Sequence, residues 1–65
     1  MNKKQIETIG NKYVTFEIET NNFKSEPLNM DKIEFVYENL ILIREGKKDV
    51  FIQMKDVKII RGVRQ

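Results

Sequence analysis

An unbroken apolar run in the middle of the chain restricts its fold more than any other feature. The run consists of Leu40-Ile41-Leu42-Ile43. A helix over residues 31–44 is one interpretation, because Asp31 and Glu34 fit a capping box and Gly46 fits a helix end. Such a helix would be apolar on nearly every side, and a chain of 65 residues cannot bury it. We therefore predict two strands joined near residues 38–39, with the run buried on both faces of a sheet.

Residues 13–20 alternate between apolar and polar side chains, which is typical of a half-buried strand. Val14, Phe16 and Ile18 are predicted to face the core, and the residues between them to face water. Asn21-Asn22 predicts a turn, because asparagine tolerates positive φ.

The C-terminal third is predicted to hold two more strands. A polar turn that contains Gly46 precedes a strand over residues 49–54. A short turn then leads into a last strand over residues 57–61, which Gly62 is expected to end.

Two segments carry weaker patterns. Pro27 has no amide proton, so residues 23–31 are interpreted as the start of a strand interrupted by a loop or bulge. Residues 1–12 are expected to form an N-terminal segment, either a short helix or an added edge strand, beside a single domain over residues 13–65. The spacing of the short strands predicts an all-β fold, a small five-stranded barrel.

Composition excludes several classes of function. The chain has no cysteine and no histidine, which removes disulfides, the usual zinc sites and histidine-based acid–base chemistry. Ser25 is the only serine, and the chain has neither a base of the usual kind to activate it nor a glycine-rich phosphate loop. We expect no enzymatic activity and no metal or cofactor. Without a signal peptide or a bilayer-spanning run, the chain is expected to be soluble and cytoplasmic, with no membrane partner.

Charge is unevenly distributed along the chain. Residues 1–40 contain five Lys or Arg and seven Asp or Glu, whereas residues 41–65 contain seven and three. The halves would form an acidic and a basic face if they map to different surfaces, and a mixed solvated surface is the equal alternative.

Residues 39–47 and 50–60 resemble the Sm-like family, in particular its bacterial Hfq branch. The two segments read Asn-Leu-Ile-Leu-Ile-Arg-Glu-Gly-Lys and Val-Phe-Ile-Gln-Met-Lys-Asp-Val-Lys-Ile-Ile. The resemblance extends over residues 13–61 and implies an Sm-like barrel. It also implies a homo-oligomeric ring, in which an exposed edge strand of one barrel pairs with its neighbour. Residues 40–44 and 50–54 carry little of the charge that normally prevents such pairing.

The resemblance further implies a ligand site on the loops after the second and fourth strands. An aromatic ring there would stack on a base, amides would bind base edges, and basic side chains would neutralise phosphate. The predicted nucleic-acid or nucleotide-binding residues are Tyr37, Asn39, Gln53, Lys55, Lys58 and Arg61. Alternatives remain for four of them: a half-buried barrel aromatic for Tyr37, an ordinary turn lysine for Lys55, and a solubilising surface for Lys58 and Arg61.

The first functional hypothesis is therefore a ring that binds single-stranded RNA or a small nucleotide. The alternative is a small, phage-encoded interaction protein that inhibits a host protein or sequesters a nucleotide second messenger. The short, Lys- and Asn-rich chain and the absence of the histidine of the Hfq-type second motif both permit it. A structural subunit without a ligand is the third hypothesis.

Overall fold

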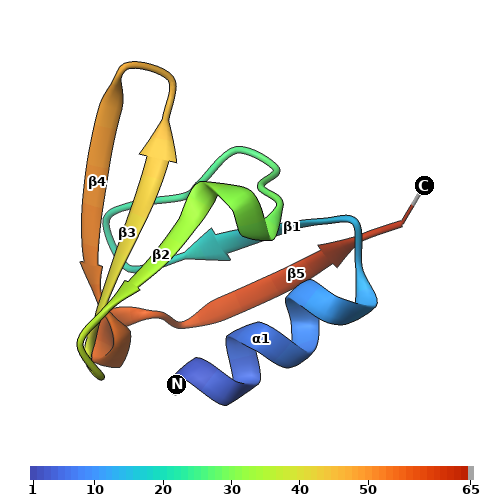
Figure 1. Cartoon of the computed structure of the whole chain (residues 1–65), viewed down its shortest axis with the longest axis horizontal. Coiled ribbons are helices and arrows are strands. Elements are labelled where there is room, and N and C mark those ends of the chain that lie inside the picture. Colours follow the sequence, from blue (N-terminus) through green and yellow to red (C-terminus); the bar gives the residue numbers. More distant parts are fainter. Residues whose placement is uncertain (65) are drawn as a thin grey trace.

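The computed structural model describes residues 1–64 as a helix followed by five strands (Figure 1). The elements are α1 (Lys3–Lys12), β1 (Thr15–Glu19), β2 (Ile33–Val36), β3 (Leu40–Glu45), β4 (Lys48–Gln53) and β5 (Ile59–Val63), with the short 3-10 helices η1 (Met30–Lys32) and η2 (Met54–Asp56). β1 pairs antiparallel with β5, and β2, β3 and β4 form a second antiparallel sheet. A small β-rich fold with an N-terminal helix is therefore confirmed. Over residues 1–64 the strands form these two sheets and no closed barrel.

β3 carries the apolar run, as predicted, and lies at the centre of its sheet. Ile41 and Ile43 are fully buried and face the main core, while Leu42 is 9% exposed and points to the opposite face. Because β3 pairs with β2 on one side and β4 on the other, the expectation that residues 40–44 offer an open edge is wrong. The outer strands are β2 and β4 in this sheet and β1 and β5 in the other.

The two sheets are joined through the segment after β1. Phe16 exchanges two backbone hydrogen bonds with Leu28, each 2.8 Å long. A second isolated β-bridge links Glu19 to Lys24, so residues 23–31 bond to β1 without forming a strand. Pro27 lies in the interruption between these contacts, in agreement with the interpretation of this segment from the sequence.

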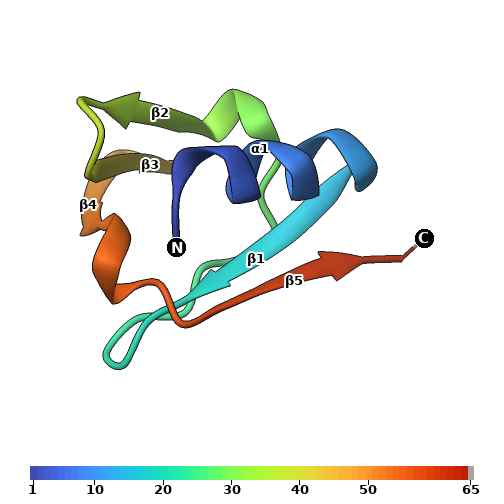
Figure 2. The same cartoon turned by 90° about the horizontal axis from the view of Figure 1, so that it is seen from below.

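α1 lies across the opening between the two sheets (Figure 2). A capping box begins the helix: the Asn2 side chain accepts the Gln5 N–H, and the Gln5 side chain accepts the Asn2 N–H, both at 2.9 Å. Ile6 is fully buried in the core, and the Lys3 ammonium lies 5.2 Å from the centre of the Phe35 ring in β2. Residues 3–12 thus form the helix, and the edge strand that was the other expectation for this segment is excluded.

The core between α1 and the sheets is almost entirely aliphatic. It consists of Ile6, Phe16, Ile18, Leu28, Ile33, Ile41, Ile43, Ile52, Met54 and Val57.

Two residues near the β1–β5 sheet differ from the expectations drawn from the sequence. Val14 is 68% exposed, because β1 begins only at Thr15 and Val14 lies in the bend before it. Gly62 lies inside β5 and does not end it. A Cβ at Gly62 would collide with carbons of the Tyr13 ring, so the close approach of this ring requires glycine.

Ser25 forms hydrogen bonds with the backbone of β1, as a residue of a neighbouring strand would. Its hydroxyl accepts the Ile18 N–H at 2.9 Å, and its own N–H donates to the Ile18 carbonyl at 2.8 Å. Both residues are buried, so water cannot replace these bonds.

We predict that Ser25→Ala lowers the free energy of unfolding by about 1–3 kcal/mol, because the buried Ile18 N–H loses its acceptor. Urea unfolding followed by circular dichroism measures this change. Asn22→Ala, at an exposed position of the same loop, is the control and should change the free energy by less than about 0.5 kcal/mol. Equal effects of the two substitutions would contradict the role of the Ser25 hydroxyl.

Candidate nucleic-acid interface

The turn between β2 and β3 presents an aromatic side chain to solvent. Val36 pairs with Leu40, which leaves Tyr37-Glu38-Asn39 as the turn. Tyr37 has a φ of 58°, in the left-handed region that residues other than glycine seldom occupy. Its side chain is 87% exposed, which excludes the half-buried alternative. The turn thus holds an aromatic ring in solvent on a backbone conformation that is uncommon for tyrosine.

The short helix η2 lies beside this turn (Figure 1). The Met54 N–H donates to the Asn39 carbonyl at 2.8 Å, and the Met54 side chain is buried in the core. The turn and η2 are therefore held together as one unit. Gln53 ends β4 and Lys55 lies in η2, and both are exposed. Four of the predicted residues lie in the turn, in η2 or at the end of β4, and we name them the turn cluster: Tyr37, Asn39, Gln53 and Lys55.

The turn cluster has little excess of positive charge. Lys55 supplies its only cation, whereas Glu38 in the same turn and Asp56 in η2 are exposed carboxylates next to it. Few phosphates could be neutralised by this arrangement. The chemistry that it offers is stacking on the Tyr37 ring together with hydrogen bonds from two amide side chains.

The other two predicted residues lie around Glu19 and not in the turn cluster. The Arg61 guanidinium donates to the Glu19 carboxylate at 2.8 Å, and the backbone N–H of Lys58 donates to the Glu19 carbonyl at 2.9 Å. The hydrogen bond from Arg61 is the main cause that holds the pKa of Glu19 below its usual value, and the charges of Arg61, Lys24 and Lys58 add to it. Arg61 is thus occupied by a carboxylate in the free protein.

Lys24 is a member of this second group that the sequence did not single out. It lies in residues 23–31, where the strand pattern is broken. The Asn21-Asn22 turn was predicted, and it could have indicated that the chain returns and brings Lys24 beside Glu19.

The positive charge of the C-terminal part does not gather into one patch. Lys47 and Lys48 lie at the tip of the β3–β4 hairpin, at the opposite end of the molecule from η2 (Figure 1). Arg44 donates to Glu34 at 2.7 Å. Because β5 pairs with the acidic strand β1, the two halves of the sequence share surfaces, and the mixed-surface alternative is correct.

Comparison of the chain with protein-family models, with curated proteins and with solved structures finds no match. Across residues 1–64, no group of three His, Cys, Asp or Glu side chains is arranged to hold a metal ion. Neither α1 nor the short helices of this part of the chain are long and apolar enough to cross a membrane.

We predict that Arg61→Met raises the pKa of Glu19 toward the usual glutamate value, because its main hydrogen-bond donor is lost. Since the pKa of Glu19 is lowered in the folded protein, this carboxylate stabilises the fold above the ordinary glutamate pKa. The contribution disappears as the pH falls through the lowered value.

An NMR titration of the Glu19 carboxyl carbon measures the shift. Arg44→Met is the matched control, because it removes the partner of Glu34 and leaves the pKa of Glu19 unchanged. An identical Glu19 titration in Arg61→Met and in the wild type would be evidence against the hydrogen bond.

Proposed function

We propose that this chain is a non-enzymatic, cytoplasmic Sm-like protein that forms a homo-oligomeric ring and binds single-stranded RNA at the turn cluster. The observation that carries the proposal is the exposed Tyr37 ring on a left-handed backbone, in a turn that the bond from Met54 to Asn39 joins to the element with Lys55.

The order of the elements supports the Sm-like part of the proposal. A helix precedes five strands, β5 lies beside β1, and β2, β3 and β4 follow as a meander. The Phe16–Leu28 bonds connect β1 to the segment that leads into β2. The strand path thus runs from β5 through β1 and residues 23–31 to β2, β3 and β4. We propose its two end strands, β5 and β4, as the edges for a neighbour.

The edge of β5 has free backbone donors. Phe16 directs its N–H and carbonyl to Leu28 and therefore away from β5. Backbone groups alternate along a strand, so Thr15 and Glu17 face β5 instead. The N–H groups of Ile60 and Gly62 consequently point to the open side of β5.

The edge of β4 has free donors as well. The bond from Met54 to Asn39 continues the β3–β4 ladder, in which Gln53 is opposite Leu40. By the same alternation, the N–H groups of Asp49 and Phe51 point away from β3. Because the two open edges differ, pairing between copies is head-to-tail, and such a contact closes into a ring when the rotation allows.

The charges of the turn cluster favour RNA over a compact nucleotide signal. A nucleotide second messenger concentrates its negative charge on few phosphates, and these would lie near Glu38 and Asp56. An RNA strand can place its bases on Tyr37 and keep most phosphates outside. A ring would repeat this stacking position once per copy.

We predict that Tyr37→Ala weakens binding of short U-rich and A-rich RNA by the equivalent of about 1–3 kcal/mol per stacked base. Electrophoretic mobility shifts across a salt series measure it. The salt dependence should be shallow, since Lys55 is the only cation of the turn cluster. Tyr37→Phe should retain binding, and Val14→Ala, at an exposed site elsewhere, is the control. Absence of any shift at low salt would exclude RNA as the ligand.

We predict that Asp49→Pro reduces assembly, because proline removes an N–H that points to the open edge of β4 and leaves the β3–β4 ladder intact. Asp49→Ser keeps that N–H and serves as the control. Sedimentation velocity measures the mass of each species. A wild-type chain that sediments only as a 7.8 kDa monomer would rule out the ring.

A further inference from the structure

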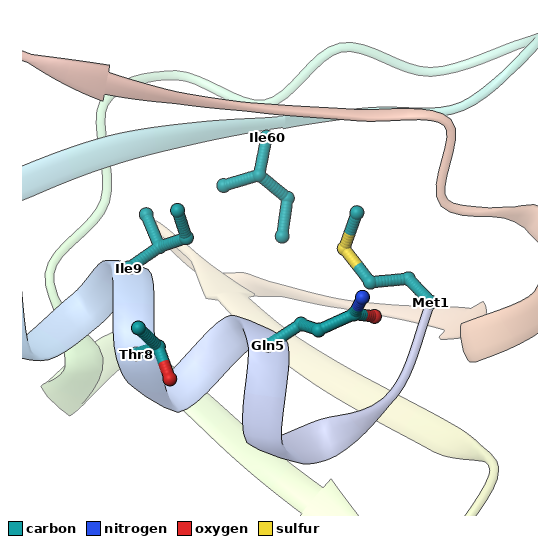
Figure 3. Close-up of a pocket in the computed structure, with 5 residues that line it drawn as sticks. All are labelled: Met1, Gln5, Thr8, Ile9 and Ile60. Carbon is teal, nitrogen blue, oxygen red and sulfur yellow. The ribbon is translucent and has the colours of Figure 1, made fainter.

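A largely apolar groove of about 340 Å³ lies between α1 and β5 (Figure 3). It is lined by Met1, Gln5, Thr8, Ile9 and Ile60. Figure 3 shows Ile60 extending from β5 toward Ile9 of α1, with Met1 and Gln5 beside them. A single large apolar side chain would match the apolar walls of this groove. A cavity of roughly 150 Å³ already accepts benzene, so the groove has room for a phenyl ring.

The groove adjoins the open edge of β5. Ile60 contributes both its side chain to the groove and an outward N–H to the edge. A helix beside an edge strand with free donors is the arrangement in which proteins bind an added strand, with main-chain bonds for affinity and a pocket for one side chain.

The same chain carries a side chain that fits. Phe51 in β4 is 58% exposed, an unusual state for a phenylalanine in a sheet. Its side chain lies on the outer face of the sheet, opposite Leu42. Its N–H points to the open edge of β4, so the ring and the free donor belong to one residue.

We propose that the groove between α1 and β5 receives Phe51 of a second copy of this chain. This inference rests on the assembly proposed above and specifies its contact. In an antiparallel pair, residues that exchange both backbone bonds have side chains on the same side. Pairing Phe51 with Ile60 of the neighbour therefore directs the phenyl ring to the groove. The same register pairs Asp49 with Gly62, whose N–H groups also face outward.

The occupant is a copy of the chain because the two free edges are complementary in both respects that matter. Each edge offers alternating free donors and acceptors, and one edge carries an exposed aromatic ring where the other has an apolar groove. The contact is heterologous: every copy gives Phe51 to one neighbour and receives Phe51 from the other.

Complementation between two variants tests this contact. Phe51→Ser removes the ring, and Thr8→Arg places a charged side chain in the groove at an exposed helical position. Each variant alone is expected to sediment as a monomer at a concentration where the wild type assembles. An equimolar mixture should give a dimer with one copy of each, because Phe51 of the Thr8→Arg chain still enters the intact groove of the Phe51→Ser chain.

Two controls separate the contact from general surface effects. Val14→Ser removes an exposed apolar side chain outside the groove, and Asn11→Arg adds a charge to α1 outside it. Both should assemble like the wild type. Circular dichroism of every variant verifies that the chain is folded.

Cross-linking provides a readout that does not depend on loss of assembly, since the chain has no cysteine. Gln53→Cys mixed with Lys58→Cys should give a disulfide-linked pair, because the register that pairs Phe51 with Ile60 places these two positions opposite each other and both chains keep Phe51 and the groove. Lys47→Cys mixed with Lys58→Cys should give none. A wild-type monomer would overturn the ring and this contact together. A wild-type assembly that Phe51→Ser leaves unchanged, or a mixture that stays monomeric, would overturn the contact alone. RNA binding by a monomeric variant is measured separately at the turn cluster.

Discussion

Burial of β3 on both faces is the constraint from which the rest of the structure follows. The inner face, with Ile41 and Ile43, is covered by α1 and by the β1–β5 sheet, and most of the apolar side chains of the chain are used there. On the outer face, fewer groups shield Leu42 from water. They are its cross-strand neighbour Phe51 and the flanking Glu34–Arg44 ion pair. Phe51 shields Leu42 but has no cover of its own. A chain of 65 residues thus buries both faces of its central strand but leaves Phe51 exposed to water.

The sequence predicts the parts of this fold that depend on local pattern and on total burial. A helix through the apolar run fails because too little chain is available to cover it, and the alternation that ends at Ile18 correctly indicates a strand. The failures have tertiary causes. Val14 follows the same alternation, but β1 begins only after it; Gly62 resembles a strand end, yet it accommodates the Tyr13 ring within β5. Asn2 and Gln5 did contain a local signal for α1, the capping box, which would have decided between helix and edge strand.

The candidate site, too, could be predicted from the sequence only in part. The grouping of Tyr37 with Lys55 was expected from a family resemblance, and nothing in their separation along the sequence requires it; a single backbone bond from Met54 to Asn39 joins the two turns. The pairing of Arg61 with Glu19 spans 42 positions and has no sequence signature. Counting cations along the chain therefore overstates the positive charge that a phosphate backbone would meet. Unlike Arg61, which is bound to Glu19, the Tyr37 ring is exposed and could contact a ligand directly.

The difference between the open edges of β4 and β5 gives any assembly built from them a direction. Each copy is related to the next by one repeated operation and not by a two-fold axis, so corresponding surfaces never face each other across a contact. In a closed ring this means that every turn between β2 and β3 emerges on the same side, while the hairpin tips with Lys47 and Lys48 emerge on the other. Such a ring has two chemically distinct faces, one that carries the Tyr37 rings and one that carries the charged hairpin tips, although only one kind of chain builds it.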